Sequence, residues 1–144
     1  MWLRLCAGLI LLLSGVDCLS QLEPVRCLSY EPAVVALHGT LSRKTFAGPP
    51  NYEDVRKGDK AETFWFLSLV SPICMNEDKS EPDLDPSREN IRKVQLVLVE
   101  VGAYDRVKAL VGKKVVATGT LIGGISAHHH TPVLLTIKSI HVGR

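Results

Sequence analysis

The chain has no long hydrophobic run beyond its first residues. The apolar stretch LCAGLILLLSGV, which follows the start MWLR, is well short of the roughly 20 apolar residues that cross a bilayer. A basic start followed by an apolar run of this length is typical of a secretory signal peptide. We therefore predict a signal peptide over residues 1–20 and a mature chain over residues 21–144 without a transmembrane segment.

A lipid anchor on Cys18 is the alternative for the same segment. Asp17 stands immediately before this cysteine, where a small neutral residue is expected, so the alternative is disfavoured. We expect a soluble protein that is periplasmic or secreted.

Cysteine is scarce as well. Removal of the signal peptide would take away Cys6 and Cys18 and leave Cys27 and Cys74. Two cysteines in an oxidising compartment usually form one disulfide, so we expect a Cys27–Cys74 bond. The CxxC spacing of a redox or metal-binding pair is absent, which disfavours a reactive or metal-binding role for these thiols.

Neither sign of charge is in strong excess. The formal net charge is +2, below what a dedicated nucleic-acid-binding domain carries, so nucleic acid is a disfavoured partner. The acidic residues are concentrated in residues 77–90, where six acids face two bases for a net charge of −4. The rest of the mature chain is correspondingly positive, which suits an anionic partner such as a cell-wall polymer or an acidic protein surface.

Motifs of enzymatic sites are also missing. No serine lies in a G-x-S-x-G elbow, and the acids of residues 77–90 lie in a segment too polar to hold a catalytic carboxylate pair. Asp83 and Asp85 lack the glycine and the closing glutamate of a calcium loop. We expect no enzymatic activity and assign no catalytic residues.

What the sequence does have is alternation of apolar and polar residues, which predicts strands. We expect a loop rich in proline, glycine and charged residues at Gly48–Glu62, a mobile acidic loop at residues 77–90, and glycine-marked bulges or bends at Gly39 and Gly119. The strands are expected over residues 33–46, 63–75 (ending near Pro72), 91–101, 114–124 and 131–142.

One helix is expected between the third and fourth strands, over residues 103–114. Its apolar stripe would comprise Tyr104, Val107, Leu110 and Val111, and Gly112 would stand at its C-terminal end. Three strands, a helix and two strands is the order of an OB fold. We therefore predict one all-β domain with one short helix, an OB-like five-stranded Greek-key barrel; another small barrel or an open α+β sheet is the alternative.

Several stretches together resemble a known family. They are YEPAVVALHGTL, GPPNYED, PICM, VQLVL, LVGKKVVATGTL and HHHTPVLLTI. Taken together they are similar to the bacterial exported family called domain of unknown function 4431, from Tyr30 to about Ile140. The resemblance implies export and an association with modules that resemble lysozyme inhibitors. It implies no activity and no catalytic residues.

The run AHHHTP before the last strand is the clearest candidate site. In an extended segment His128 and His130 share one face and His129 lies on the other. His128 and His130 could therefore share a divalent metal ion if further ligands lay nearby. The alternatives are a structural tip, in which one histidine binds the hairpin backbone and another packs beside an aromatic ring, or a surface that responds to pH or to a partner.

The run TFWF places Phe64 and Phe66 on one face of a strand and Trp65 on the other. Exposed rings on the second and third strands of an OB-like barrel could stack on bases or sugars. The alternative is that the two phenylalanines lie in the core and the tryptophan packs beneath the long loop.

Together these patterns predict an exported, non-enzymatic binding module of the cell envelope, of a protein-interaction or inhibitor-like type. We expect a monomer without a cofactor, whose contact surfaces are Gly48–Glu62 and Ala127–Thr131. The two alternatives are a small-ligand or divalent-metal module centred on His128 and His130, and a binder of single-stranded nucleic acid or polyanions. The candidate contact residues are Tyr52, Trp65, His129 and Thr131.

Overall fold

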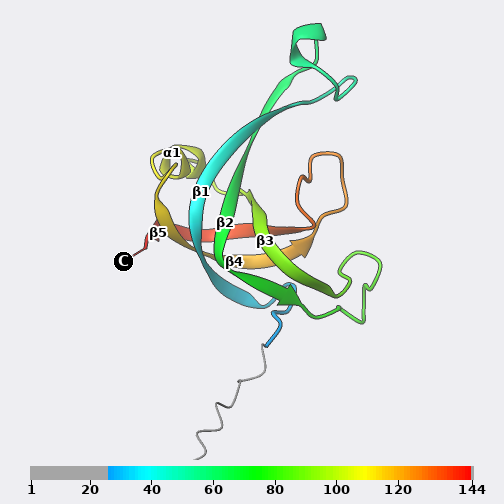
Figure 1. The fold of residues 1–144 in the computed structure, drawn as a ribbon, viewed down its shortest axis with the longest axis vertical. Coiled ribbons are helices and arrows are strands. Elements are labelled where there is room, and N and C mark those ends of the chain that lie inside the picture. The colour runs from blue at the N-terminus through cyan, green and yellow to red at the C-terminus, as the bar shows by residue number, and fades with distance from the viewer. Residues whose placement is uncertain (1–25, 144) are drawn as a thin grey trace, which may run out of the picture.

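The computed structural model describes residues 26–143 and is mostly β (Figure 1). The predicted signal peptide lies outside the described residues. One α-helix and one 3-10 turn accompany five strands, so the expected mostly β fold with one short helix is confirmed. The elements are β1 (Val34–Ala47), η1 (Val55–Lys57), β2 (Ala61–Met75), β3 (Arg88–Val97), α1 (Ala103–Lys108), β4 (Lys114–Gly123) and β5 (Val133–Val142). No helix in residues 26–143 is long and apolar enough to cross a membrane.

The strands form a closed barrel in the order β1-β2-β3-β5-β4. Strand β4 pairs with β1 and closes the ring, and every pairing is antiparallel except that of β3 with β5. The parallel pair Leu96 and Leu135 marks where β3 lies beside β5. Helix α1 belongs to the connection that leaves β3 and returns the chain to β4.

Strands β1 and β2 are the longest, and together they project beyond the barrel as an arm (Figure 1). The first half of β1 pairs with β4 on one side as far as Thr40, whereas its second half pairs only with β2, as far as Ala47. The turn η1 lies at the tip of this arm. We call the segment 42–66 the arm.

The barrel core is filled by one face of each strand. Leu41, Leu67, Val94, Leu121 and Leu135 are all fully buried. Their alternation with outward residues follows the two-residue period of a strand. The core therefore needs no residue of the arm tip.

Trp65 is part of this core, and our assignment of it as a contact residue is wrong. The side chain is only 3% exposed and packs in the cluster that contains Leu67 and Leu96. The prediction that Phe64 and Phe66 share the opposite face is confirmed by the register, in which Trp65 pairs with Leu96 and Phe66 pairs with Gln95. The phenylalanines are thus on the outer face, and the tryptophan is the residue that fills the barrel.

Helix α1 is shorter than predicted, ending at Lys108. Val107 is buried as expected, but Tyr104 and Val111 are exposed. A helix of fewer than two turns can bury only a short apolar stripe against the barrel. The prediction of a four-residue apolar stripe is therefore wrong at Tyr104 and Val111. Gly112 has a φ of 81°, the left-handed conformation that glycine adopts readily.

Strand β2 does not end near Pro72 as predicted but continues to Met75, with a shift in its pairing to β3 between Ser68 and Ile73. Proline cannot donate a ladder hydrogen bond, and strands accommodate it at such irregularities. Strand β3 begins at Arg88, within the predicted acidic loop. That loop is anchored to β4, since Asp85 Oδ1 accepts a hydrogen bond of 2.8 Å from the Gly123 N–H.

Two glycines allow strands to approach closely. The pairing of β4 with β5 shifts between Thr118 and Gly119, which confirms the predicted irregularity there, and a Cβ at Gly119 would overlap the carbonyl oxygen of Thr136. At Gly39 no shift occurs. A Cβ there would instead overlap the Ser68 carbonyl oxygen.

The predicted disulfide is confirmed between Cys27 and Cys74. Beside it, the Leu28 N–H donates to the Cys74 carbonyl and the Asn76 N–H donates to the Leu28 carbonyl, each at 2.8 Å. The disulfide and this short parallel bridge fasten the start of the described chain to the end of β2.

Removing the disulfide with Cys27→Ser/Cys74→Ser should lower the free energy of unfolding by about 2–4 kcal/mol, because the bond closes a long loop in the unfolded chain. The sequence separation of the two cysteines is 47. Urea unfolding of the oxidised protein and the variant measures the difference. Equal midpoints would show that the bond constrains nothing that matters to stability.

Candidate functional site

The β4–β5 loop (residues 124–132) lies against the arm, on the outer face of β2. Ser42, Lys44 and Phe46 of β1 pair with Phe66, Phe64 and Glu62 of β2. By the strand period these six side chains share one face, opposite to Trp65 and Leu67. Figure 1 shows the β4–β5 loop rising beside the arm.

Gln95 holds the β4–β5 loop in place. Its side-chain Nε2 donates to the His128 carbonyl at 2.9 Å, and its Oε1 accepts from the His130 N–H at 2.8 Å. Its backbone N–H donates to Thr131 Oγ1 at 2.9 Å. Because Gln95 is only 3% exposed, these bonds replace water for a buried amide, which would be costly to leave unsatisfied.

We call the three hydrogen bonds between Gln95 and the β4–β5 loop the clamp. Thr131 belongs to it, and the assignment of Thr131 as a contact residue is wrong. The residue is buried, and its hydroxyl donates to the Val133 carbonyl at 2.7 Å while accepting from Gln95. The hydroxyl therefore orients the first residues of β5, and its only proton is already donated within the protein.

His130 packs on the outer aromatic rings. Its imidazole stacks on Phe46 with 3.7 Å between ring centroids and 6° between planes, and it meets the edge of Phe64 at 4.8 Å. Its Nε2 is enclosed and has no hydrogen-bond partner among residues 26–143. The expected packing of one histidine beside an aromatic ring is thus confirmed.

His128 links the loop to the arm. Its Nδ1 lies 2.9 Å from Glu62 Oε2, and its Nε2 lies 3.4 Å from the Tyr52 hydroxyl. The Tyr52 ring meets the imidazole edge-on, with centroids 5.7 Å apart. The two surfaces predicted separately, Gly48–Glu62 and Ala127–Thr131, are therefore brought together as one.

The loop around Tyr52 is shaped by the buried carboxylate of Asp59. Its two oxygens accept hydrogen bonds from the backbone N–H groups of Asn51, Glu53 and Asp54 at 2.8–3.0 Å. These bonds, led by that of Asn51, hold the pKa of Asp59 below its ordinary value. Tyr52 itself has a φ of 60°, a left-handed conformation that is uncommon for residues other than glycine.

His129 faces the backbone of its own loop. Its Nδ1 accepts hydrogen bonds from the N–H groups of Ile125 at 2.9 Å and Ser126 at 3.3 Å. This confirms the expectation that one histidine binds the hairpin backbone. Its Nδ1 is therefore occupied by the backbone of the loop, and its assignment as a contact residue stays a prediction.

The histidine run does not bring a metal-binding set with it. Within residues 26–143, no three His, Cys, Asp or Glu side chains are grouped closely enough to hold a metal ion. Both ring nitrogens of His128 face protein partners, Glu62 and Tyr52. The predicted metal role of His128 and His130 stays a prediction, and the described residues offer it no third ligand.

Burial sets the charge state of the two inner histidines. Burial lowers the pKa of His129, with a smaller contribution from His128. Burial also lowers the pKa of His130, where His128, Lys44 and His129 act in the same direction and Glu62 acts against them. Both imidazoles are consequently neutral near pH 7.

An open groove of about 420 Å³ lies on the same outer face, beside His130. Phe46 and Phe66 form its aromatic part. Three basic residues and no acidic residue line it: Arg43, Lys44 and Lys93.

Sequence reasoning missed several residues of this site. Gln95 was inside a predicted strand, and its only signal was a polar residue interrupting the apolar run VQLVL. Glu62 was seen only as the end of a loop, and Phe46 as the end of a strand. Each of these meets a partner in the β4–β5 loop that lies at least 33 positions away in the sequence, which no local pattern reports.

Comparison with known proteins gives one match. The model of a family described as a domain of unknown function, DUF4431, matches residues 93–141. This segment is therefore similar to the DUF4431 family. It runs from the outer face of β3 through α1 and β4 to the end of β5, and so includes Gln95 and the three histidines. No curated protein and no solved structure matches the chain.

The DUF4431 segment therefore supplies the clamp and the loop, while the arm comes from outside the matched residues. The resemblance recognised in the sequence is confirmed for this segment. The family description assigns no activity, so the function has to be argued from the site.

The lowered pKa of His130 makes stability depend on pH. Below the ordinary histidine pKa of 6.5 the unfolded chain binds the proton more readily than the folded one, so stability present above pH 6.5 is lost as the pH falls. We expect the urea midpoint to drop between pH 7.5 and pH 5.5, and to drop less in His130→Phe, whose ring can still stack on Phe46.

The comparison at pH 7.5 controls for packing, because a neutral imidazole and a phenyl ring should there support similar midpoints. An identical loss of stability on acidification in wild type and His130→Phe would contradict the assignment of this pH dependence to His130.

Proposed function

We propose that the protein is an exported, non-enzymatic binding module built on an OB-like Greek-key barrel. The strand order β1-β2-β3-β5-β4, the parallel pairing of β3 with β5 and the helix between β3 and β4 support the OB-like assignment. The signal-peptide pattern of residues 1–20 and the Cys27–Cys74 disulfide support export.

The observation that carries the proposal is the contact of His128 with Tyr52 and Glu62. It joins the arm and the β4–β5 loop, two segments far apart in the sequence, into one surface. Tyr52 is 42% exposed and the His128 side chain is 46% exposed. Tyrosine and histidine combine an apolar ring with a polar tip, and tyrosine in particular is enriched where proteins meet their partners.

The proposed partner is a component of the cell envelope, either a protein or a cell-wall polymer. An exposed surface held in shape before binding favours association, because less conformational freedom is lost on contact. The clamp of Gln95 and the Asp59 hydrogen bonds supply that order on the two sides of the surface.

Stacking of single-stranded nucleic acid is disfavoured by the same geometry. One face of Phe46 is covered by His130, and Lys44 Nζ lies 4.7 Å from the centroid of the same ring. A base needs a free aromatic face for stacking, and the Phe46 ring is already in contact with both His130 and Lys44.

The test places a photo-crosslinking amino acid at position 52 of the full chain and compares it with the same substitution at position 104. Tyr104 is the matched control, since it is also a tyrosine and is 48% exposed. We expect an adduct from position 52 that is outcompeted by excess wild-type protein, and much less adduct from position 104.

A competitor carrying Tyr52→Ala/His128→Ala should fail to suppress the adduct, because it lacks the surface. Equal adducts from positions 52 and 104, or suppression by both competitors alike, would rule out this surface as the contact site. Mass analysis of the processed N-terminus in the same cells tests cleavage after residue 20.

A further inference from the structure

The groove beside His130 has a charge pattern that the contact surface of Tyr52 and His128 does not explain. Its lining residues include three basic residues and no acidic one. Arg43 pairs with Trp65 and so points to the opposite face, which leaves Lys44 and Lys93 as the cations of the groove. The carboxylate of Glu62, on the same face, is engaged by His128, whose Nδ1 lies 2.9 Å from Glu62 Oε2. The groove is therefore a local excess of positive charge on a chain whose formal net charge is only +2.

Two of the cations lie over aromatic rings. Lys44 Nζ is 4.7 Å from the centroid of Phe46, and Lys93 Nζ is 6.0 Å from that of Phe66. Such contacts favour ammonium positions above the ring faces. Both lysines are otherwise exposed, and neither has a carboxylate within ion-pairing distance among residues 26–143.

The two lysines come from different strands, β1 and β3, which flank β2 on either side. A ligand that meets both must lie across β2, over Phe66. The volume of about 420 Å³ is within the range of about 300–1,000 Å³ typical of small-ligand sites. The groove is open to solvent rather than enclosed.

We propose that this groove binds an acidic polysaccharide, whose chain crosses β2 and places carboxylates at Lys44 and Lys93. The inference rests on the proposed function and deepens it by naming a chemical class for the partner. Charge-assisted hydrogen bonds from the two ammonium groups would select an acidic sugar over a neutral one.

Nucleic acid and acidic peptide fit the groove less well. A base lacks a free face on Phe46, which His130 and Lys44 already flank. A peptide could add to the arm edge of β1, which has no neighbouring strand after Thr40. Charged residues at that edge, Arg43 and Lys44, are of the kind that discourages strand addition.

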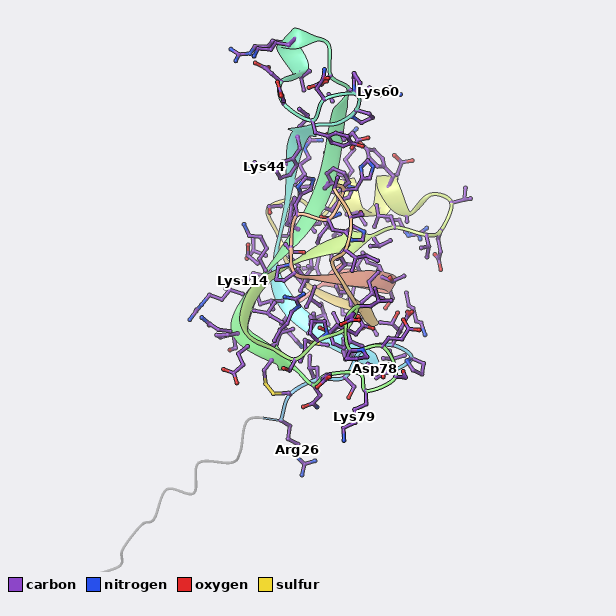
Figure 2. The ribbon with its side chains drawn as sticks, turned by 90° about the vertical axis from the view of Figure 1, so that its right-hand side faces the viewer. Arg26, Lys44, Lys60, Asp78, Lys79 and Lys114 are labelled. Carbon is purple, nitrogen blue, oxygen red and sulfur yellow. A yellow bond between two sulfur atoms is a disulfide. The ribbon has the colours of Figure 1, made fainter. Side chains whose placement is uncertain are left out.

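The experiment measures binding of a fluorescent oligogalacturonate to the mature protein by anisotropy at pH 7.5. Lys44→Gln/Lys93→Gln should weaken binding at least about tenfold, through the loss of two charge-assisted contacts. The control Lys79→Gln/Lys138→Gln removes the same charge from exposed positions outside the groove. Lys79 lies at the end of the molecule opposite to the arm that carries Lys44 (Figure 2).

The control variant should bind within about twofold of wild type, since distant surface charges are screened by salt. A neutral oligoglucan of equal length should compete poorly. Equal weakening in both variants would show that binding depends on diffuse surface charge and not on the groove. Tighter binding of single-stranded DNA or polyglutamate would show that the groove prefers one of those polymers to a polysaccharide. Absence of oligogalacturonate binding overturns the inference.

These outcomes are separate from those of the crosslinking test. An adduct at position 52 together with no oligogalacturonate binding would leave the binding module standing and remove only the polysaccharide. Circular dichroism of each variant confirms that the exposed lysines can be replaced without loss of the fold.

Discussion

The arrangement of the site depends on the buried side chain of Gln95. Both ends of its amide bind the backbone of the β4–β5 loop, at the His128 carbonyl and the His130 N–H. A buried amide without partners would cost about 1–3 kcal/mol, so the loop and the barrel stabilise each other. With the loop fixed, His130 is set against Phe46 and His128 is set against Tyr52 and Glu62. One hydrogen-bonded residue of β3 thus determines where two histidines meet the arm.

Because Gln95 fixes the loop, it also decides which groups of the outer face stay exposed. The polar groups of the loop are mostly engaged with each other: His129 with Ile125 and Ser126, and Thr131 with Val133. What is left exposed consists of Tyr52, His128 and the two lysines held over rings. Such groups provide contact area and charge. They lie on a closed barrel tied by the Cys27–Cys74 disulfide, and this ordered frame supports the proposed binding role.

The sequence predicted those features that follow from local periodicity and from residue pairs with few alternatives. Five strands, one helix between the third and fourth, the Cys27–Cys74 bond and the sorting of Phe64 and Phe66 away from Trp65 all have this origin. It did not predict which side of β2 faces the core, because that strand is apolar on both faces and periodicity cannot choose between them. The core status of Trp65 follows from barrel closure, and the roles of Gln95 and Glu62 follow from contacts between segments distant in the chain. Thr131 was misassigned for the same reason, since its partner is the backbone of β3.

The most direct test of this account is hydrogen exchange at the His130 amide, followed by NMR in wild type and in Gln95→Leu. If Gln95 fixes the loop, the wild-type amide is protected and its exchange accelerates at least about tenfold in the variant, as expected for a local opening. The Leu67 amide in the core strand should stay equally protected in both proteins. A His130 amide that exchanges freely in the wild-type protein, or at the same slow rate in both, would contradict the central role of Gln95.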